Sequence, residues 1–250
     1  MMDGIKAVGF DLDGTFMKTR VDYASLAQAD KRVLESHGVP FDEVYSKEYV
    51  KRPRYPIKDW LEAHGRSGEF KGISDEIDRA FAEIEMEFVS EARPFPGSLE
   101  CLDILRSKGL KTGILTRGCL EYARRALGPT GALEKLDVVM GRDHSSYDDA
   151  KPSPKATMEF ADMLGVKPSE LLYIGDNVTD YMSAHGAGAV FAGVLTGSGS
   201  VELWNRTDPE MLVLNRAGDC VRFFRLRSRA RSPTGCPARC RKGSGTRCWA

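Results

Sequence analysis

The sequence predicts an α/β protein with a doubly wound, parallel sheet and an inserted small α-helical domain. Three observations support this fold class. From residue 94 onward, apolar stretches of strand length alternate with stretches of helical spacing. Several apolar stretches end abruptly in an aspartate or a threonine, and the 76 residues from 18 to 93 lack strand-like alternation. Because parallel strands have right-handed connections, their carboxyl ends are expected to face one crevice.

The first strand and the helical insertion are expected before residue 94. The strand is residues 5–10. Asp22 precedes a stretch of helical spacing that ends at Gly38 and Pro40, and Ser74 is expected to cap a longer helix. Two shorter helices are expected at 42–51 and 57–64, separated by residues 51–56.

The remaining elements follow the turn 94–97, Pro-Phe-Pro-Gly. Strands are expected at 111–115, 137–140, 171–175, 189–192 and 211–214. Helices are expected at 98–108, 118–127, 153–164, 177–184 and 217–226. The domain organisation is therefore a core of residues 1–17 and 94–226, an insertion of residues 18–93, and a tail of residues 227–250.

Composition indicates a folded protein in the cytoplasm. Hydrophobic residues make up 42% of the chain and charged residues 29%, as in ordinary soluble domains. No stretch approaches roughly eighteen apolar residues and the N-terminus does not resemble a secretory signal, so no membrane partner is expected. Cys101, Cys119 and Cys220 show no pairing pattern and are interpreted as reduced thiols.

The tail differs from the rest of the chain in charge. Nine of the 36 basic residues and none of the 36 acidic ones lie in 220–250, so residues 1–219 carry a net charge of −9. Residues 227–250 are rich in Arg, Gly, Ser and Pro without apolar periodicity, which predicts disorder. Cys236, Cys240 and Cys248 lack the companion ligands of a zinc site. The tail is either a nucleic-acid-binding arm or the product of a translated frameshift or read-through; otherwise no nucleic-acid partner is expected.

Two aspartates follow the first strand. Asp11 and Asp13 are one residue apart, and Gly14-Thr15 lets the backbone turn sharply. Carboxylates this close repel each other, which indicates a cation between them or a proton on one of them. Since carboxylate and carbonyl oxygens suit Mg²⁺, the pattern indicates magnesium-assisted attack of an aspartate on a phosphoryl group. The competing interpretation is a solvated, Asp-rich turn.

Three further strand ends or adjoining loops carry polar groups. Thr116, with the backbone N–H groups of Arg117 and Gly118, forms a site suited to phosphate oxygens, unless Thr116 is a plain helix cap. Lys151 offers a fixed positive charge, although a lone lysine is more often a solvated surface residue. Asp176 ends an apolar stretch, and Asp180 lies one helical turn later on the same face of the helix. The two carboxylates either complete a Mg²⁺ site or are acidic residues that stabilise the helix N-terminus through the helix dipole.

These four motifs, in this order, resemble the haloacid dehalogenase (HAD) superfamily over about residues 5–225. The insertion at 18–93 looks like the small helical cap of its subfamily I. The segments 94–97 and 151–154 (Lys-Pro-Ser-Pro) resemble phosphoglycolate phosphatase-like members. The resemblance implies a Rossmann-like HAD core, and a cap that opens for substrate and closes for chemistry.

The resemblance also implies a role for each motif residue. Asp11 would be the nucleophile that forms an aspartyl-phosphate, and Asp13 the general acid that later activates water as a base. Mg²⁺ would be held by the Asp11 carboxylate, the Asp13 backbone carbonyl and Asp176, with Asp180 close by.

The remaining motif residues would hold the substrate. Thr116 and Lys151 would bind the oxygens of the transferring phosphoryl group, assisted by the backbone amides of Leu12 and Arg117. Because Arg117 adjoins Thr116, it is also the better candidate for substrate selection. A basic cluster in the insertion is interpreted either as a second anion site or as a solvated face; its members are Lys47, Lys51, Arg52, Arg54 and Lys58. Phe16 is expected to line the pocket or to pack inside the fold.

The predicted function is a Mg²⁺-dependent phosphatase acting on a small phosphorylated metabolite, such as phosphoglycolate, a sugar phosphate, a nucleotide or pyrophosphate. Asp13 favours phosphoryl transfer, because the dehalogenases of the superfamily lack this second aspartate. Two other readings remain: a phosphomutase of the same fold, and a catalytically idle binding protein that works through its basic tail. The oligomeric state has no signature in the sequence.

Overall fold

The computed structural model describes residues 4–45 and 54–224. Its centre is a six-stranded sheet in which every neighbouring pair is parallel, which confirms the predicted fold class. In spatial order the strands are β5 (Val138–Met140), β4 (Lys111–Leu115), β1 (Ala7–Phe10), β6 (Leu171–Gly175), β7 (Val190–Val194) and β8 (Leu212–Leu214). The sequence interpretation located all six, and the bounds of β4 and β6 agree with it to the residue.

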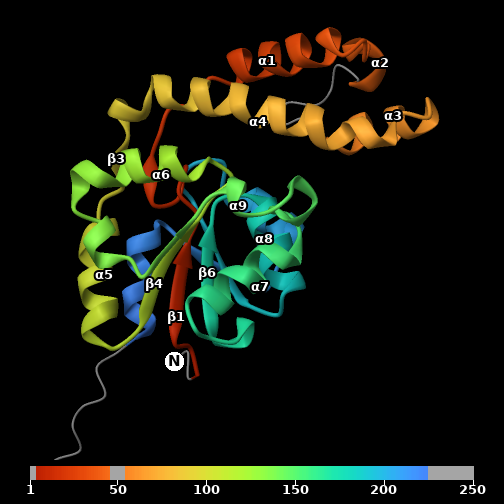
Figure 1. The fold of residues 1–250 in the computed structure, drawn as a ribbon. Coiled ribbons are helices and arrows are strands. Elements are labelled where there is room, and N and C mark those ends of the chain that lie inside the picture. The colour runs from red at the N-terminus through yellow and green to blue at the C-terminus, as the bar shows by residue number, and fades with distance from the viewer. Residues whose placement is uncertain (1–3, 46–53, 225–250) are drawn as a thin grey trace, which may run out of the picture.

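Helices cover both faces of the sheet (Figure 1). One face carries α5 (Ser98–Ser107), α6 (Leu120–Leu127) and the 3₁₀ segment η8 (Ala217–Phe223); the other carries α7 (Pro154–Met163), α8 (Val178–Gly186) and α9 (Val201–Thr207). Side chains of β1 alternate between these layers: Val8 and Phe10 pack with the first group, and Ala7 packs with the second. β1 is buried throughout, as expected for a central parallel strand.

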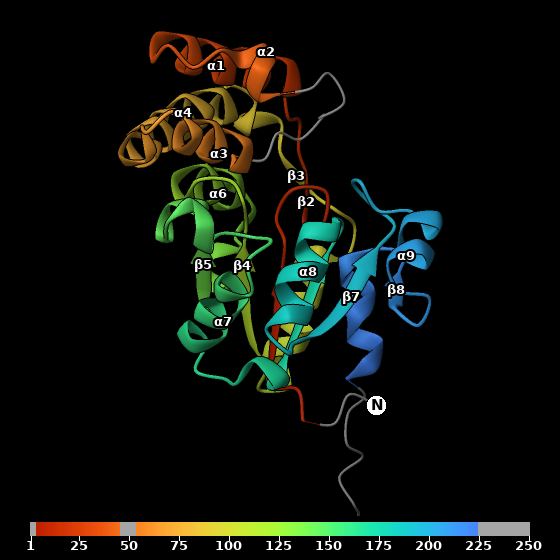
Figure 2. The ribbon, with the colours of Figure 1, turned by 90° about the vertical axis from the view of Figure 1, so that its right-hand side faces the viewer.

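The helical insertion lies over the carboxyl ends of the strands (Figures 1 and 2). It contains α1 (Tyr23–Ser36), α2 (Phe41–Val44), α3 (Tyr55–Ala63) and α4 (Phe70–Glu87), packed around a cluster of their own. The Asp22 side chain caps α1 by accepting hydrogen bonds from the backbone N–H groups of Ala24 and Ser25. The helices therefore have an apolar core separate from the two that flank the sheet.

A short antiparallel ribbon joins the insertion to the sheet. β2 (Met17–Lys18) pairs with β3 (Arg93–Pro94), so the chain leaves and returns at adjacent points. The expected domain boundaries, 17/18 and 93/94, fall inside these two strands. The division into core and insertion at these residues stays a prediction. Residues 46–53 and the tail, with the interpretations placed on them, lie outside the described residues.

Some local expectations were wrong. Ser74 does not cap a helix, because α4 begins four residues earlier at Phe70 and Ser74 is buried inside it. Tyr55 and Pro56 belong to the first turn of α3, where proline is tolerated, rather than to a linker. The last helix is the 3₁₀ segment 217–223, and α9 was not expected. Phe16 is fully buried against Phe10, so it packs inside the fold.

Seven further 3₁₀ segments complete the element order: η1 (Ser67–Glu69), η2 (Val89–Glu91), η3 (Gly128–Thr130), η4 (Leu133–Lys135), η5 (Arg142–His144), η6 (Tyr147–Asp149) and η7 (Pro168–Glu170). In the part of the chain that the structure describes, no helix combines the length and the apolar character needed to cross a membrane.

Candidate active site

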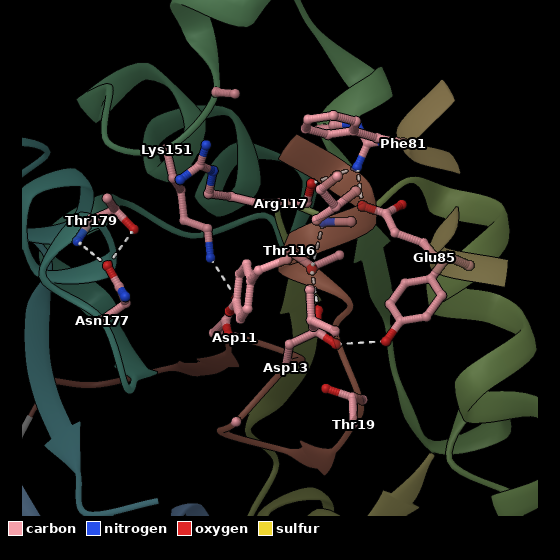
Figure 3. A pocket seen from close by; sticks show the side chains of 18 of the residues that line it. Asp11, Asp13, Thr19, Phe81, Glu85, Thr116, Arg117, Lys151, Asn177 and Thr179 are labelled. Carbon is pink, nitrogen blue, oxygen red and sulfur yellow. Dashed lines mark hydrogen bonds and ion pairs between the residues drawn. The ribbon is translucent and has the colours of Figure 1, made fainter. Parts of the chain in front are cut away.

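The predicted site residues come together at the carboxyl ends of the central strands, beneath the helical insertion. They line one cavity of about 800 Å³, whose lining also includes residues of α1, α3 and α4. Figure 3 shows Phe81 and Glu85 of α4 in this cavity together with Asp11 and Asp13. The predicted residues in its lining are Asp11, Asp13, Thr116, Arg117, Lys151, Asp176 and Asp180. Leu12 is the exception: its side chain is fully buried in the core, so its predicted contribution is confined to the backbone amide.

Lys151 is a buried site residue and not a solvated surface lysine. Its ammonium lies 2.6 Å from Oδ1 of Asp11 and 2.6 Å from Oδ1 of Asp180. It also donates to the Leu115 carbonyl at 3.0 Å and to the Tyr173 hydroxyl at 2.8 Å. Burial works against the charged amine, but the two carboxylates outweigh it and hold the pKa of Lys151 well above its usual range.

The site holds more negative charge than Lys151 balances. Burial raises the pKa of the Asp11 carboxyl well above its usual value; Lys151 opposes this rise, while Asp180, Asp176 and Asp13 add to it. A cationic partner beyond Lys151 would therefore stabilise Asp11 as the carboxylate.

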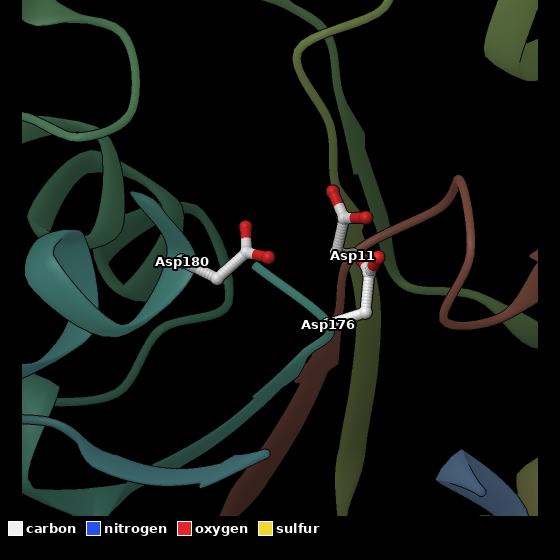
Figure 4. A group of neighbouring side chains, drawn as sticks. All are labelled: Asp11, Asp176 and Asp180. Carbon is white, nitrogen blue, oxygen red and sulfur yellow. The ribbon is translucent and has the colours of Figure 1, made fainter. Parts of the chain in front are cut away.

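Three carboxylates are grouped closely enough to hold a metal ion. Asp11, Asp176 and Asp180 each offer an oxygen, and these atoms lie within 4.8 Å of one another (Figure 4). An all-oxygen, carboxylate-rich set suits a hard cation such as Mg²⁺, and the surplus of negative charge fits a divalent ion. The Asp13 carboxyl lies outside this group, consistent with a contribution through its backbone carbonyl alone.

Asp176 is held by a loop that the sequence interpretation did not identify. Its Oδ2 accepts from the backbone N–H of Ser198 at 2.6 Å and from the Ser198 hydroxyl at 2.8 Å. Its Oδ1 accepts from the Thr15 hydroxyl at 3.1 Å. Such contacts fix the orientation of a metal-ligating carboxylate.

Two glycines let the backbone approach Asp176. A Cβ on Gly197 would lie 2.3 Å from Oδ2 of Asp176 and 2.6 Å from the Cα of Gly14. Gly14 and Gly197 both have positive φ, +81° and +61°. Only glycine combines a positive φ with the lack of a Cβ that would clash with Asp176. Gly14 of the first motif is therefore needed for the packing of Asp176 as well as for the turn.

Asp13 is held by hydroxyl groups and not by an ammonium. The Tyr122 hydroxyl donates to its Oδ1 at 2.6 Å, and the Thr116 hydroxyl lies 3.4 Å from its Oδ2. Burial raises the pKa of the Asp13 carboxyl above its usual value, and the hydrogen bonds from Tyr122 and Thr19 oppose this rise. A raised pKa suits a group that must both give and take a proton near neutral pH. Tyr122 was missed by sequence reasoning, because an apolar helix face gives no sign of a phenol that reaches another strand end.

Thr116 is not the cap of the helix that follows it. Cys119 occupies the N-cap of α6, and the Thr116 hydroxyl instead accepts from the backbone N–H of Gly118 at 3.0 Å. Thr116 is almost fully buried at the floor of the cavity. The structure thus removes the simpler interpretation of this residue and leaves its hydroxyl beside Asp13.

Arg117 is exposed at the cavity wall. Among the described residues its guanidinium has no ion pair or hydrogen bond. Arg54, in contrast, is buried and makes paired contacts with both carboxylate oxygens of Asp78, at 2.8 and 3.0 Å. Lys58 is paired with Asp148. Neither residue belongs to an unpaired anion site, and Lys47, Lys51 and Arg52 lie outside the described residues.

A buried ion pair connects the insertion to the core. Arg142, in η5 after β5, binds Glu85 of α4, and its Nε lies 2.9 Å from Oδ1 of Asp78 without hydrogen-bond geometry. The same guanidinium donates to the carbonyls of Asp78 and Arg117, each at 3.0 Å. Glu85 also accepts from the backbone N–H of Cys119 at 3.3 Å. No local sequence pattern indicates these contacts, because the partners are far apart in the chain.

The parallel sheet carries a buried, carboxylate-rich site at its strand ends, beneath a helical insertion. A profile of the haloacid dehalogenase-like hydrolases matches residues 5–188, so the chain belongs to this family. The match confirms the resemblance drawn from the four motifs, and the chain is a phosphoric monoester hydrolase of the HAD type.

Curated relatives and solved structures agree with this assignment. The chain is 28% identical to an N-acetylmuramic acid 6-phosphate phosphatase of Pseudomonas aeruginosa, over 77% of this chain and 83% of the relative. It is 30% identical to a validoxylamine A 7'-phosphate phosphatase of Streptomyces hygroscopicus (76% and 86%) and 27% identical to a phosphoglycolate phosphatase of Neisseria gonorrhoeae (83% and 87%). A HAD-like hydrolase structure from Bacteroides fragilis shares the fold, with a TM-score of 0.61 at 22% identity over 86% of this chain and 99% of that one.

Proposed function

We propose that the chain is a Mg²⁺-dependent phosphatase that cleaves a small phosphorylated metabolite through an aspartyl-phosphate on Asp11. The observation that carries the proposal is the placement of Asp11. Its carboxyl is buried at the end of β1, with one oxygen fixed by Lys151 and two further carboxylates close by. A nucleophile held this way approaches a phosphoryl group with little reorganisation.

In the first step, the free oxygen of Asp11 attacks phosphorus and the bond from phosphorus to the ester oxygen breaks. Asp13 gives its proton to the departing oxygen, which leaves as an alcohol. In the second step, Asp13 takes a proton from water, whose oxygen attacks the aspartyl-phosphate and releases inorganic phosphate and Asp11. Lys151 and the Thr116 hydroxyl hold the transferring phosphoryl oxygens. Bound through Asp11, the Asp13 carbonyl and Asp176, with Asp180 close by, Mg²⁺ would neutralise charge on the phosphoryl group.

The cavity favours a leaving group larger than glycolate. Its volume, about 800 Å³, is at the upper end of the range for ligand pockets. Tyr23 and Tyr55 are 49% and 43% exposed and both line it, although large apolar side chains are usually covered. Aromatic faces suit the ring of a sugar or cyclitol, and Arg117 suits a second anionic group on it. Two relatives are named as phosphatases of ring-bearing phosphates, which supports the same preference.

Phosphate release from a panel of esters tests the proposal. Phosphoglycolate, hexose 6-phosphates, nucleoside monophosphates and pyrophosphate are each compared with Mg²⁺ and with EDTA. We expect Mg²⁺-dependent release by the wild type and by Asp162→Asn, an exposed control on α7, and no release by Asp11→Asn. An isomerised sugar phosphate without free phosphate would instead show a phosphomutase.

Should no ester react, BeF₃⁻, which mimics the aspartyl-phosphate, separates a narrow specificity from an idle site. Binding to the wild type but not to Asp11→Asn would retain the proposal. Absence of binding to both would refute it.

We also propose a cytoplasmic location, supported by the three described cysteines, which are buried thiols outside any disulfide.

A further inference from the structure

Tyr122 is a buried phenol whose hydroxyl is committed to the site. The residue lies in the first turn of α6, is 4% exposed, and packs in the cluster on that face of the sheet. Its hydroxyl donates to Oδ1 of Asp13 at 2.6 Å, across a sequence separation of 109 residues. A buried Tyr hydroxyl needs a partner, and this one has a carboxylate that follows a different strand.

Because of this contact, the two carboxylate oxygens of Asp13 have different surroundings. Oδ1 accepts from Tyr122, whereas Oδ2 lies on the side of the Thr116 hydroxyl, 3.4 Å away. Thr116 follows β4 and Asp11 follows β1, which are neighbouring strands, and both residues line the cavity. Oδ1 has the short hydrogen bond and Oδ2 only the long contact from Thr116, so a proton carried by Asp13 resides on Oδ2.

The surrounding structure fixes the phenol. A Cβ on Gly118 would lie 2.8 Å from Cδ1 of Tyr122, so glycine is needed there for the ring to occupy its place. The backbone N–H of Tyr122 is bound by Sγ of Cys119, 3.4 Å away. The ring therefore has little freedom to follow Asp13 if that carboxyl rotates, and the carboxyl has a fixed donor to return to.

We propose that Tyr122 is a positioning residue that holds Asp13 so that Oδ2 faces the ester oxygen of the substrate. It acts through Asp13 and not on the phosphoryl group. The inference rests on the proposed function, since it assumes that Asp13 is the general acid. Proton transfer needs heavy atoms about 2.6–3.2 Å apart, so a carboxyl that keeps only its contacts with Thr19 and Thr116 is less often in reach. Loss of the Tyr122 hydroxyl therefore weakens protonation of the leaving group and leaves nucleophilic attack by Asp11 unchanged.

A matched pair of esters separates these two steps. p-Nitrophenyl phosphate and phenyl phosphate are similar in size, but only the second has a leaving group that needs protonation. The value of kcat/KM covers the steps up to departure of the alcohol, so it includes the acid role of Asp13 and excludes its later role as a base. We expect Tyr122→Phe, which keeps the ring, to lower kcat/KM for phenyl phosphate by about tenfold, part of the 10²–10⁴-fold that general acids supply. For p-nitrophenyl phosphate kcat/KM should change by less than about twofold, on the same reasoning.

Two controls exclude a merely structural effect. The ratio of the two kcat/KM values, taken in one preparation, does not depend on the fraction of protein that is folded. Tyr181→Phe should leave this ratio unchanged, because it removes a hydroxyl that, within the described part of the chain, donates only a 3.5 Å contact to Asp208. In an Asp13→Asn background, Tyr122→Phe should no longer alter the ratio, because the group through which it acts is gone.

Equal losses for both esters would overturn the inference, as would a Tyr122→Phe effect that persists in Asp13→Asn. The proposed function fails in a different way. In that case the wild type releases phosphate from none of the esters tested, these two included, and does not bind BeF₃⁻.

Discussion

Arg142 offers the sharpest test of how the helical insertion docks on the core. Its side chain is 11% exposed, and that of Glu85, its partner on α4, is 14% exposed. Breaking such a buried pair by removing one member costs about 3–5 kcal/mol, because the remaining charge is left without compensation. The Asp78 side chain is 33% exposed and is also paired with Arg54, so its contact with Arg142 adds little free energy. The cost of removing Arg142 is therefore taken at the lower end of this range, about 3 kcal/mol.

Arg142→Met is therefore expected to destabilise the docked arrangement by about 3 kcal/mol, or about 100-fold in population. If only the docked arrangement performs chemistry, kcat/KM for p-nitrophenyl phosphate falls by up to that factor. Glu85→Gln should lower kcat/KM less, because the amide retains hydrogen bonds to Arg142. Adding Arg142→Met to Glu85→Gln should then cost less than it does in the wild type.

The loss of activity caused by Arg142→Met should depend on pH. Burial raises the pKa of Glu85, and Arg142 opposes that rise. Without Arg142 the pKa rises further, so Glu85 is protonated at higher pH and no longer buries an unpaired charge. The activity of Arg142→Met relative to wild type should thus recover as the pH falls and worsen as the pH rises through this pKa. Lys155→Met, which breaks an exposed pair with Asp149, is the control. Activity of Arg142→Met within twofold of wild type at all pH values would refute the reasoning.

Two further predictions concern the support of Asp176. Ser198→Ala removes the hydroxyl contact at 2.8 Å but keeps the backbone N–H, so Mg²⁺ affinity should fall about tenfold, measured by Mg²⁺ titration of activity. An unchanged Mg²⁺ dependence would show that Ser198 does not orient this carboxylate. Gly197→Ala forces a Cβ to within 2.3 Å of Asp176 Oδ2, so it should lose activity and thermal stability, whereas Gly65→Ala, with a similar φ of +70° and open space, should lose only a little stability. Equal effects of the two substitutions would mean that backbone strain alone matters.

The sheet and its polar strand ends were predictable because they depend on local signals. Apolar stretches of four or five residues followed by Asp11, Thr116 or Asp176 mark where each strand ends. In a parallel sheet those ends must meet, so the sequence interpretation brought together residues up to 165 positions apart. Lys151 was placed by its position in a loop and by the resemblance, because nothing around it shows that it is buried.

The supporting contacts were not predictable in the same way. Tyr122, Ser198 and Arg142 act through side chains whose partners depend on how helices and loops pack, which spacing does not record. The error at Ser74 has a simpler cause. Serine favours helix caps, yet the apolar spacing of Phe70, Ile73 and Ile77 already carries the helix past it.

The pairing of β2 with β3 has a consequence for how the molecule can change. Met17 pairs with Pro94 and Lys18 pairs with Arg93, so the chain leaves the core and returns to it along two adjacent, paired strands. A different set of helices, longer or shorter, can be spliced between these residues without altering the register of the sheet. The insertion can thus vary in length and sequence while the sheet and its strand ends keep their arrangement.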